Sequence, residues 1–237
     1  MSVYVYAITS SESRPRLDDL HGVGEAAPPL RTLTEGPLKA VVSDAPETLR
    51  AKRRDLGAHH SVQERLLSER AVLPMRFGLI AEDDDAVRAA LDENVERYTR
   101  RLSELEGRAE FNLKAAADED ILLGRVLAES EEIRRLNEAT RGGAGTYEER
   151  MTLGELVARD VQALQDGVTA DLVEALRPYT SAETESGATA DHFLAVSFLV
   201  DRDREREFVE AGKKLAERYG PEIEVRIRGP LPPYSFS

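Results

Sequence analysis

The strict alternation of residues 108–116 limits what the second half of this chain can fold into. Every odd-numbered residue from 109 to 115 is apolar and every even-numbered residue from 108 to 114 is polar. This is the period of a strand with one buried and one hydrated face. Residues 222–228 alternate in the same way, whereas residues 191–200 are strongly apolar. We therefore expect one strand of this half to be covered on both faces, by helices on one and by other parts of the fold or a partner on the other.

Helical patterns separate these strands. A long helical stretch runs from about 119 to 177, and another helix is expected at 203–219. The capping-box signature Thr152-x-x-Glu155 predicts that the long stretch restarts there. With a polar strand at 179–186, the order in this half is β-α-β-β-α-β. That order predicts a ferredoxin-like domain with an enlarged helical first crossover, its third strand central and its fourth at an edge.

The first half has the pattern of a smaller α+β domain. Residues 2–9 are rich in β-branched and aromatic residues, and a hairpin is expected at 30–43. From 53 to 70 the period becomes helical, and Asp83-Asp84-Asp85 can cap a further helix that ends near Leu105. The apolar stripe of the 53–70 helix holds Leu56, His59, Val62 and Leu66.

The whole chain is therefore predicted to be an α+β protein with two domains. The expected segments are an N-terminal α+β domain at 1–106, a ferredoxin-like domain with a helical insertion at 107–229, and a proline-rich C-terminal tail at 230–237.

Charge and residue usage narrow the functions that this chain can have. Its 237 residues carry a formal net charge of −13 at pH 7 and include no cysteine. The charge argues against nucleic acid or an anionic membrane surface as the partner, and the missing thiols exclude disulfides, a cysteine nucleophile and thiolate zinc sites. The sequence has no apolar run of about 18 residues and opens directly as a strand. We expect a cytoplasmic, monomeric protein.

Familiar catalytic and cofactor motifs do not occur in the sequence. It contains no G-x-x-x-x-G-K-[ST], no H-E-x-x-H, no G-x-S-x-G and no G-x-G-x-x-G after a strand. We therefore predict no catalytic residue, no metal, no cofactor and no enzymatic activity. His59 lies on an apolar helix stripe, which is typical of a buried, hydrogen-bonded histidine. A metal ligand or a general base is the alternative, and the role of His60 stays open.

Polar residues on the hydrated face of the second sheet are candidates for an interaction surface. They are Arg108, Glu110, Asn112 and Lys114 on the first strand of this half and Arg226 and Arg228 on the last. Opposite charges on paired strands can face each other across the ladder. Two interpretations stay open: an ordinary hydrated sheet face, or a polar docking surface for another domain or a partner.

The C-terminal segment Gly229-Pro-Leu-Pro-Pro-Tyr-Ser-Phe-Ser237 is too rich in proline for a helix or a central strand. Aromatic residues make up 5% of the chain, yet Tyr234 and Phe236 both lie in its last four positions. We expect these two side chains to anchor the tail on its own chain, near the junction of the two domains, so that the tail acts as a clasp.

Five segments resemble the gas vesicle protein GvpF/GvpL family. They are Tyr4-Val-Tyr-Ala-Ile8, the helix with His59, Val72-Leu-Pro-Met-Arg-Phe-Gly78, Glu110-Phe-Asn-Leu-Lys114 and Gly229-Pro-Leu-Pro-Pro-Tyr-Ser-Phe236. Together these segments extend over nearly the whole chain.

This resemblance implies a minor structural or assembly protein of gas vesicles, without catalytic residues. Such a protein binds the small hydrophobic shell protein during gas vesicle nucleation or formation, and other gas vesicle proteins are further expected partners. The resemblance also implies two α+β domains, the second of them ferredoxin-like. The alternative from another class is a small-molecule-binding regulatory module, because ferredoxin-like domains often serve that role.

Overall fold

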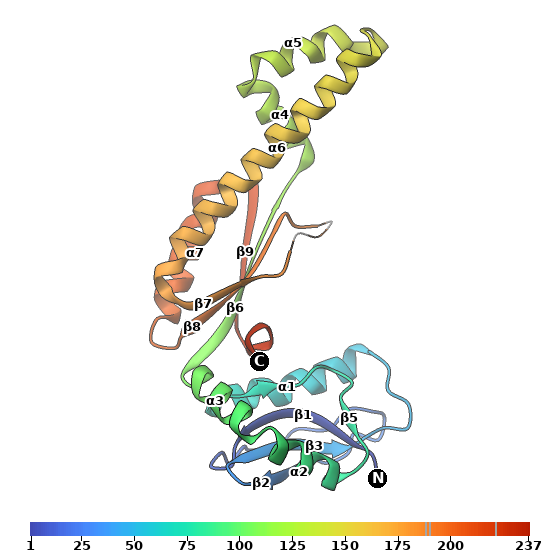
Figure 1. The fold of residues 1–237 in the computed structure, drawn as a ribbon, viewed down its shortest axis with the longest axis vertical. Coiled ribbons are helices and arrows are strands. Elements are labelled where there is room, and N and C mark those ends of the chain that lie inside the picture. Colours follow the sequence, from blue (N-terminus) through green and yellow to red (C-terminus); the bar gives the residue numbers. More distant parts are fainter. Residues whose placement is uncertain (188, 190, 221) are drawn as a thin grey trace. The chain divides into compact units, whose positions relative to one another are not determined.

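The structure is a computed structural model that describes residues 1–187, 189, 191–220 and 222–237. The chain forms two compact units. The first contains residues 1–111, 199–203 and 229–237, and the second contains residues 112–198 and 204–228. The protein combines helices with two antiparallel sheets, as the α+β class requires (Figure 1). The domain limits expected from the sequence, with a change at 106/107, stay predictions.

The first sheet is organised around β1. Its strands are β1 (Val3–Ser10), β2 (Arg31–Glu35), β3 (Leu38–Asp44), β4 (Leu73–Pro74) and β5 (Ile80–Ala81). The order is β2-β3-β1-β4, and β5 also pairs with β1. β1 and β3 run antiparallel, from Val3 opposite Asp44 to Ser10 opposite Leu38. Neighbouring strands flank β1 on both edges and helices pack against it, and all of its residues except the last are buried. The expected first strand and hairpin are confirmed.

Helix α1 (Arg53–Glu69) buries a stripe that differs at one position from the expected one. His59, Val62 and Leu66 are buried, but Leu56 is 43% exposed and Asp55 is buried instead. Asp55 takes the inner position because its carboxylate accepts the backbone N–H of Gly24, at 3.0 Å. A buried carboxylate is tolerated when hydrogen bonds satisfy it.

Two helices, rather than the single one expected, follow Asp83. They are α2 (Asp84–Glu93) and α3 (Val95–Leu105). The side chain of Asp83 accepts the N–H of Ala86 at 2.8 Å, so the predicted cap is confirmed. The break falls at Asn94, whose backbone leaves the helical region and whose side chain donates to the carbonyl of Ala90 at 2.9 Å. Asparagine favours such local bonds over helix continuation.

The second sheet has the order β7-β8-β6-β9. Its strands are β6 (Arg108–Ala117), β7 (Thr180–Glu185), β8 (Leu194–Asp201) and β9 (Ile223–Leu231). The third strand in sequence, β8, is therefore internal, and the fourth, β9, lies at an edge. In β8, Leu194, Val196 and Leu199 are each at most 5% exposed. Because these positions include both faces of the strand, the predicted two-sided burial is confirmed.

The crossover between β6 and β7 is helical. It contains α4 (Glu119–Glu129), α5 (Glu131–Thr140) and α6 (Tyr147–Leu176), and α7 (Glu205–Tyr219) connects β8 to β9 (Figure 1). Short 3-10 helices lie at Arg141–Gly143, Arg177–Tyr179 and Tyr234–Phe236. α7 packs closely on β9 at Gly212, where an added Cβ would clash with the side chain of Ile227.

The capping box of the long helix is not the predicted one. Thr146 and Glu149 exchange both bonds of the motif, with the N–H of Glu149 donating to Thr146 Oγ1 at 3.1 Å. Thr152 lies inside α6, nearly two turns after Thr146. Thr146 directly follows Gly145, whose φ of 76° favours glycine, and the chain therefore turns into the helix earlier than expected. None of the helices in the described residues is both long and apolar enough to cross a membrane.

Candidate functional site

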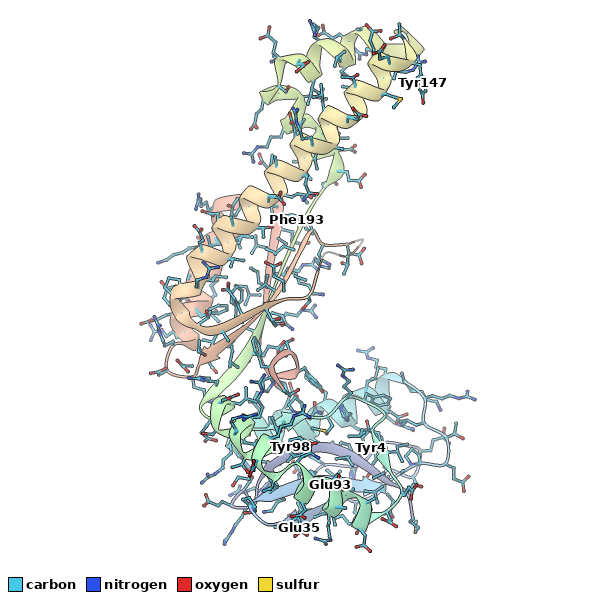
Figure 2. The ribbon with its side chains drawn as sticks, viewed as in Figure 1. Tyr4, Glu35, Glu93, Tyr98, Tyr147 and Phe193 are labelled. Atoms are coloured by element: carbon cyan, nitrogen blue, oxygen red, sulfur yellow. The ribbon has the colours of Figure 1, made fainter. Side chains whose placement is uncertain are left out.

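A chain of buried hydrogen bonds occupies the interior of the first unit and begins at His59. Its Nε2 lies 3.0 Å from the carbonyl oxygen of Met75, and its Nδ1 lies 2.9 Å from the hydroxyl of Tyr4. A carbonyl can only accept, so Nε2 carries the proton and Nδ1 accepts from Tyr4. The Tyr4 oxygen in turn accepts the N–H of Gly78, at 3.1 Å. Met75 and Gly78 both belong to the 72–78 segment, and Tyr4 lies on β1 (Figure 2).

Burial determines the protonation states of His59 and Tyr4. Desolvation lowers the pKa of His59 to about 4, partly offset by its bond to the Met75 carbonyl. Desolvation also raises the pKa of Tyr4 far above its ordinary value. Both groups are therefore neutral near pH 7, and His59 is a structural residue that joins β1, α1 and the 72–78 segment. The prediction of a buried, hydrogen-bonded histidine is confirmed.

Gln63, one turn further along α1, extends the network to the tail. Its amide nitrogen donates to the carbonyls of Tyr6 and Met75, at 2.8 and 3.0 Å. Its amide oxygen accepts the hydroxyl of Tyr234. Because Gln63 is fully buried, these partners satisfy an amide that would otherwise be costly in the core.

The tail packs on the first unit, of which it is part. Phe236 is 7% exposed, whereas Tyr234 is 39% exposed and is held mainly through its hydroxyl. Ser235 donates from its backbone N–H and its hydroxyl to the two carboxylate oxygens of Glu110, each at 2.8 Å. At the start of the tail, Gly229 lies so close to the ring of Phe111 that a Cβ would clash with it. The tail's predicted role as a clasp between domains stays a prediction.

The six candidate interaction residues do not form one open face. Glu110 is 2% exposed, so the expectation that it lies on a hydrated face is wrong; Ser235 covers it. Arg108 bonds Asp201 of β8 at 2.7 Å, and Asn112 accepts from Ser197 at 2.7 Å. Lys114, Arg226 and Arg228 are exposed.

Arg226 does not form the expected ion pair with an opposite charge on the described residues of the paired strand. Its guanidinium lies 2.6 Å from Glu224, two residues earlier on the same strand. The six residues are divided between the units, with Arg108 and Glu110 in the first and the others in the second. An interaction role for them stays a prediction.

The first unit carries a groove of about 520 Å³ between the 73–76 segment and α3. Leu73, Pro74 and Leu79 form part of its apolar lining, together with Tyr98 of α3 (Figure 2). Its arginines are Arg76, Arg97, Arg100 and Arg101. The sequence alone does not predict this groove, because tertiary structure brings the 73–76 segment to the arginines of α3.

The second unit carries a groove of about 480 Å³, which we call the crossover groove. It lies among α4, α6 and the residues that precede β8. Apolar side chains dominate its lining: Leu122, Leu123, Val157, Val161 and Phe193. Leu123 is 38% exposed, and Val157, Val161 and Phe193 are partly exposed. Phe193 is labelled in Figure 2. Within the described part of the chain, no cluster of three or more histidine, aspartate or glutamate side chains is arranged to hold a metal ion.

Comparison with known proteins identifies the family to which this chain belongs. The family model described as gas vesicle synthesis protein GvpL/GvpF matches residues 2–237. This chain belongs to that family. It is 46% identical to gas vesicle protein F of Streptomyces sp. (strain CB03234) over 238 residues, which covers 100% of this chain and 99% of the relative. Gas vesicle protein L of the same organism is 28% identical, over 99% of this chain and 92% of the relative.

Solved structures share the fold of this family member. The crystal structure of the gas vesicle protein GvpF from Anabaena sp. PCC7120 matches with a TM-score of 0.86 over 99% of this chain and 97% of that chain, at 21% identity. The structure of GvpF from Microcystis aeruginosa matches with a TM-score of 0.79, over 99% and 98%, also at 21% identity. Hydrogen bonds of the first unit join all five segments that resembled the family. Tyr4 bonds His59, and His59 bonds Met75. Gln63 of the same helix bonds Tyr234 of the tail, and Ser235 bonds Glu110.

Proposed function

We propose that this protein binds the small hydrophobic shell protein of gas vesicles and acts during gas vesicle nucleation or formation. Membership of the gas vesicle GvpL/GvpF family supports a gas vesicle role. The crossover groove is the observation that carries the binding proposal. Its partly exposed Leu123, Val157 and Phe193 offer apolar surface that a hydrophobic partner would remove from water.

We also infer that the second unit is a ferredoxin-like domain whose first crossover has been enlarged. The order of its elements, β6, then α4 to α6, β7, β8, α7 and β9, supports this inference. So does the sheet order β7-β8-β6-β9, with the third strand internal and the fourth at an edge. The enlarged crossover supplies α4 and α6, and thus most of the crossover groove.

The net charge of −13 suits this function. A strongly charged partner keeps a complex with an apolar protein dispersed while the exposed apolar surface is covered. A cytoplasmic location, a monomeric state and the lack of enzymatic activity stay predictions, as does the alternative of a regulatory small-molecule module.

Two neighbouring positions on α4 allow a matched test. Leu123 lines the crossover groove and is 38% exposed, whereas Ile121 is 39% exposed and does not line it. Tagged wild-type protein, Leu123→Asp and Ile121→Asp are each co-expressed with the shell protein and captured. Burial of a leucine contributes roughly 1.5–3 kcal/mol, so Leu123→Asp should lower the captured shell protein by about tenfold or more.

Ile121→Asp should capture the shell protein as the wild type does, and both variants should keep the wild-type melting temperature. If the wild type captures no shell protein, the proposed function is wrong. If the wild type binds but both variants bind equally well or equally poorly, the crossover groove is not the binding surface.

A further inference from the structure

The groove of the first unit combines an apolar floor with a cationic rim. Leu79 is 44% exposed, and Met75 and Tyr98 are partly exposed. Arg76 lines the groove from the 73–76 segment, and Arg97 and Arg100 line it from α3. We call this feature the arginine-edged groove. Its position in the first unit separates it from the crossover groove, and its chemistry is different.

Most of the arginines that line this groove have no ion pair among the described residues. Arg101 pairs with Glu104 at 2.7 Å. Among the residues that the structure describes, none places a carboxylate within 4.0 Å of the guanidinium of Arg76, Arg97 or Arg100. Arg97 lies 5.9 Å from the ring centroid of Tyr98, and this contact leaves its N–H donors free to bind. The groove is also lined by Glu104, the partner of Arg101, so the positive charge of Arg76, Arg97 and Arg100 remains in excess at this groove, in a chain with a net charge of −13.

We propose that the arginine-edged groove binds an acidic amphipathic helix of a partner protein. Arg97, Arg100 and Arg101 lie within about one turn of α3, and Arg76 faces them from the other wall. A helix that carries carboxylates three and four residues apart presents them along one side, in reach of such a row. Each guanidinium can bind a carboxylate with two parallel N–H bonds.

The apolar floor distinguishes a helix from a small anion as the occupant. A small dianion would contact the arginines and leave Leu79, Met75 and Tyr98 in water. An amphipathic segment covers these side chains with its apolar face and meets the rim with its carboxylates. Burial of apolar surface and charge pairing then act together, as they do in other helix-in-groove complexes.

The test uses the full-length protein and two designed fluorescent helical peptides of about 18 residues. The peptides share one leucine face and differ only in having glutamate or lysine on the flanking positions. Binding is followed by fluorescence anisotropy at about 50 mM and 500 mM NaCl, because salt at the higher concentration screens surface charges. The wild type should bind the glutamate peptide about tenfold more tightly than the lysine peptide at low salt, even though the net charge of the protein favours lysine.

A double charge reversal makes the prediction specific. Arg97→Glu with Arg100→Glu should invert the preference, so that the lysine peptide binds more tightly. Arg134→Glu with Arg135→Glu is the matched control, since both side chains are exposed on α5 and change the net charge equally. This control should keep the wild-type preference for the glutamate peptide.

Three results would overturn the proposal. The first is a wild type without preference for the glutamate peptide. The second is a control pair that changes the preference as the groove pair does. The third is displacement of the glutamate peptide by inorganic phosphate at the concentration of the protein, which would make the groove a small-anion site. Because the assay contains no shell protein, its outcome is independent of the proposed function.

Discussion

At the scale of single residues, the first unit is organised by buried polar groups that satisfy one another. His59 joins Tyr4 to the Met75 carbonyl, and Gln63 joins two backbone carbonyls to the hydroxyl of Tyr234. Each bond contributes modestly, but a lost partner would leave a buried group unpaired at a cost of about 1–3 kcal/mol. The network therefore specifies one arrangement of β1, α1, the 72–78 segment and the tail.

The neutral state of His59 has a consequence for stability. Its pKa in the folded protein is about 4, below the ordinary value of 6.5. Between these two pH values the unfolded chain binds a proton that the folded chain does not. Lowering the pH through this window should therefore reduce the free energy of unfolding by up to about 3 kcal/mol from this residue alone.

The direct measurement is an NMR titration of the imidazole ring of His59 in the folded protein. We expect a midpoint below pH 5, with Nε2 carrying the proton in the neutral form. A midpoint at pH 6 or above would show that the ring is not buried as the structure has it.

Sequence reasoning at this scale succeeded where the pattern was local. The helical stripe placed His59 in the core because position alone decides which face of a helix is buried. It failed for Glu110, which strand alternation assigned to a hydrated face. The carboxylate is covered by Ser235, a residue far along the chain, and no local pattern reports such a contact.

At the scale of elements, the tail is held by two kinds of contact. Phe236 is buried through its ring, whereas Tyr234 is exposed at 39% and bonds Gln63 through its hydroxyl. The expectation that both aromatic residues anchor the tail treated them as equal. Their contributions to stability should differ, because ring burial removes more apolar surface from water than one hydroxyl bond gains.

Two substitutions separate these contributions. Phe236→Ala should lower the free energy of unfolding by about 3 kcal/mol, since it removes a buried ring. Tyr234→Phe should lower it by only about 1 kcal/mol, since it removes a single hydroxyl. Chemical denaturation of both variants gives the two values. Equal losses, or a larger loss for Tyr234→Phe, would contradict this description of the tail.

The order and type of most elements could be predicted from the sequence, and their ends less well. The alternation of residues 108–116 predicted β6, and the apolar stretch 191–200 predicted the covered strand β8. The break at Asn94 and the capping box at Thr146 were missed, because several residues could serve as either cap. Which of them does is decided by the packing of the neighbouring helices.

At the scale of the whole molecule, a strongly acidic chain carries two grooves of different chemistry, one in each unit. The crossover groove is lined mainly by apolar side chains, with Glu119 and Asp191 as its acidic residues, whereas the arginine-edged groove carries four arginines. Neither is visible in the sequence, because each brings together residues from segments far apart in the chain. The family, by contrast, was recognisable from segments that build the core of the first unit, where tertiary contacts restrict the residues that fit.

The most direct test of the central claim is site-specific photo-crosslinking to the shell protein. A benzophenone amino acid replaces Phe193 in the crossover groove or Tyr147, which is 73% exposed at the start of α6 and does not line the groove (Figure 2). Both positions are aromatic, so the replacement is equally conservative. During co-expression with the shell protein, irradiation should yield a crosslink to it from position 193 and none from position 147. A crosslink from position 147 alone, equal crosslinks from both positions, or none from position 193 would contradict the account.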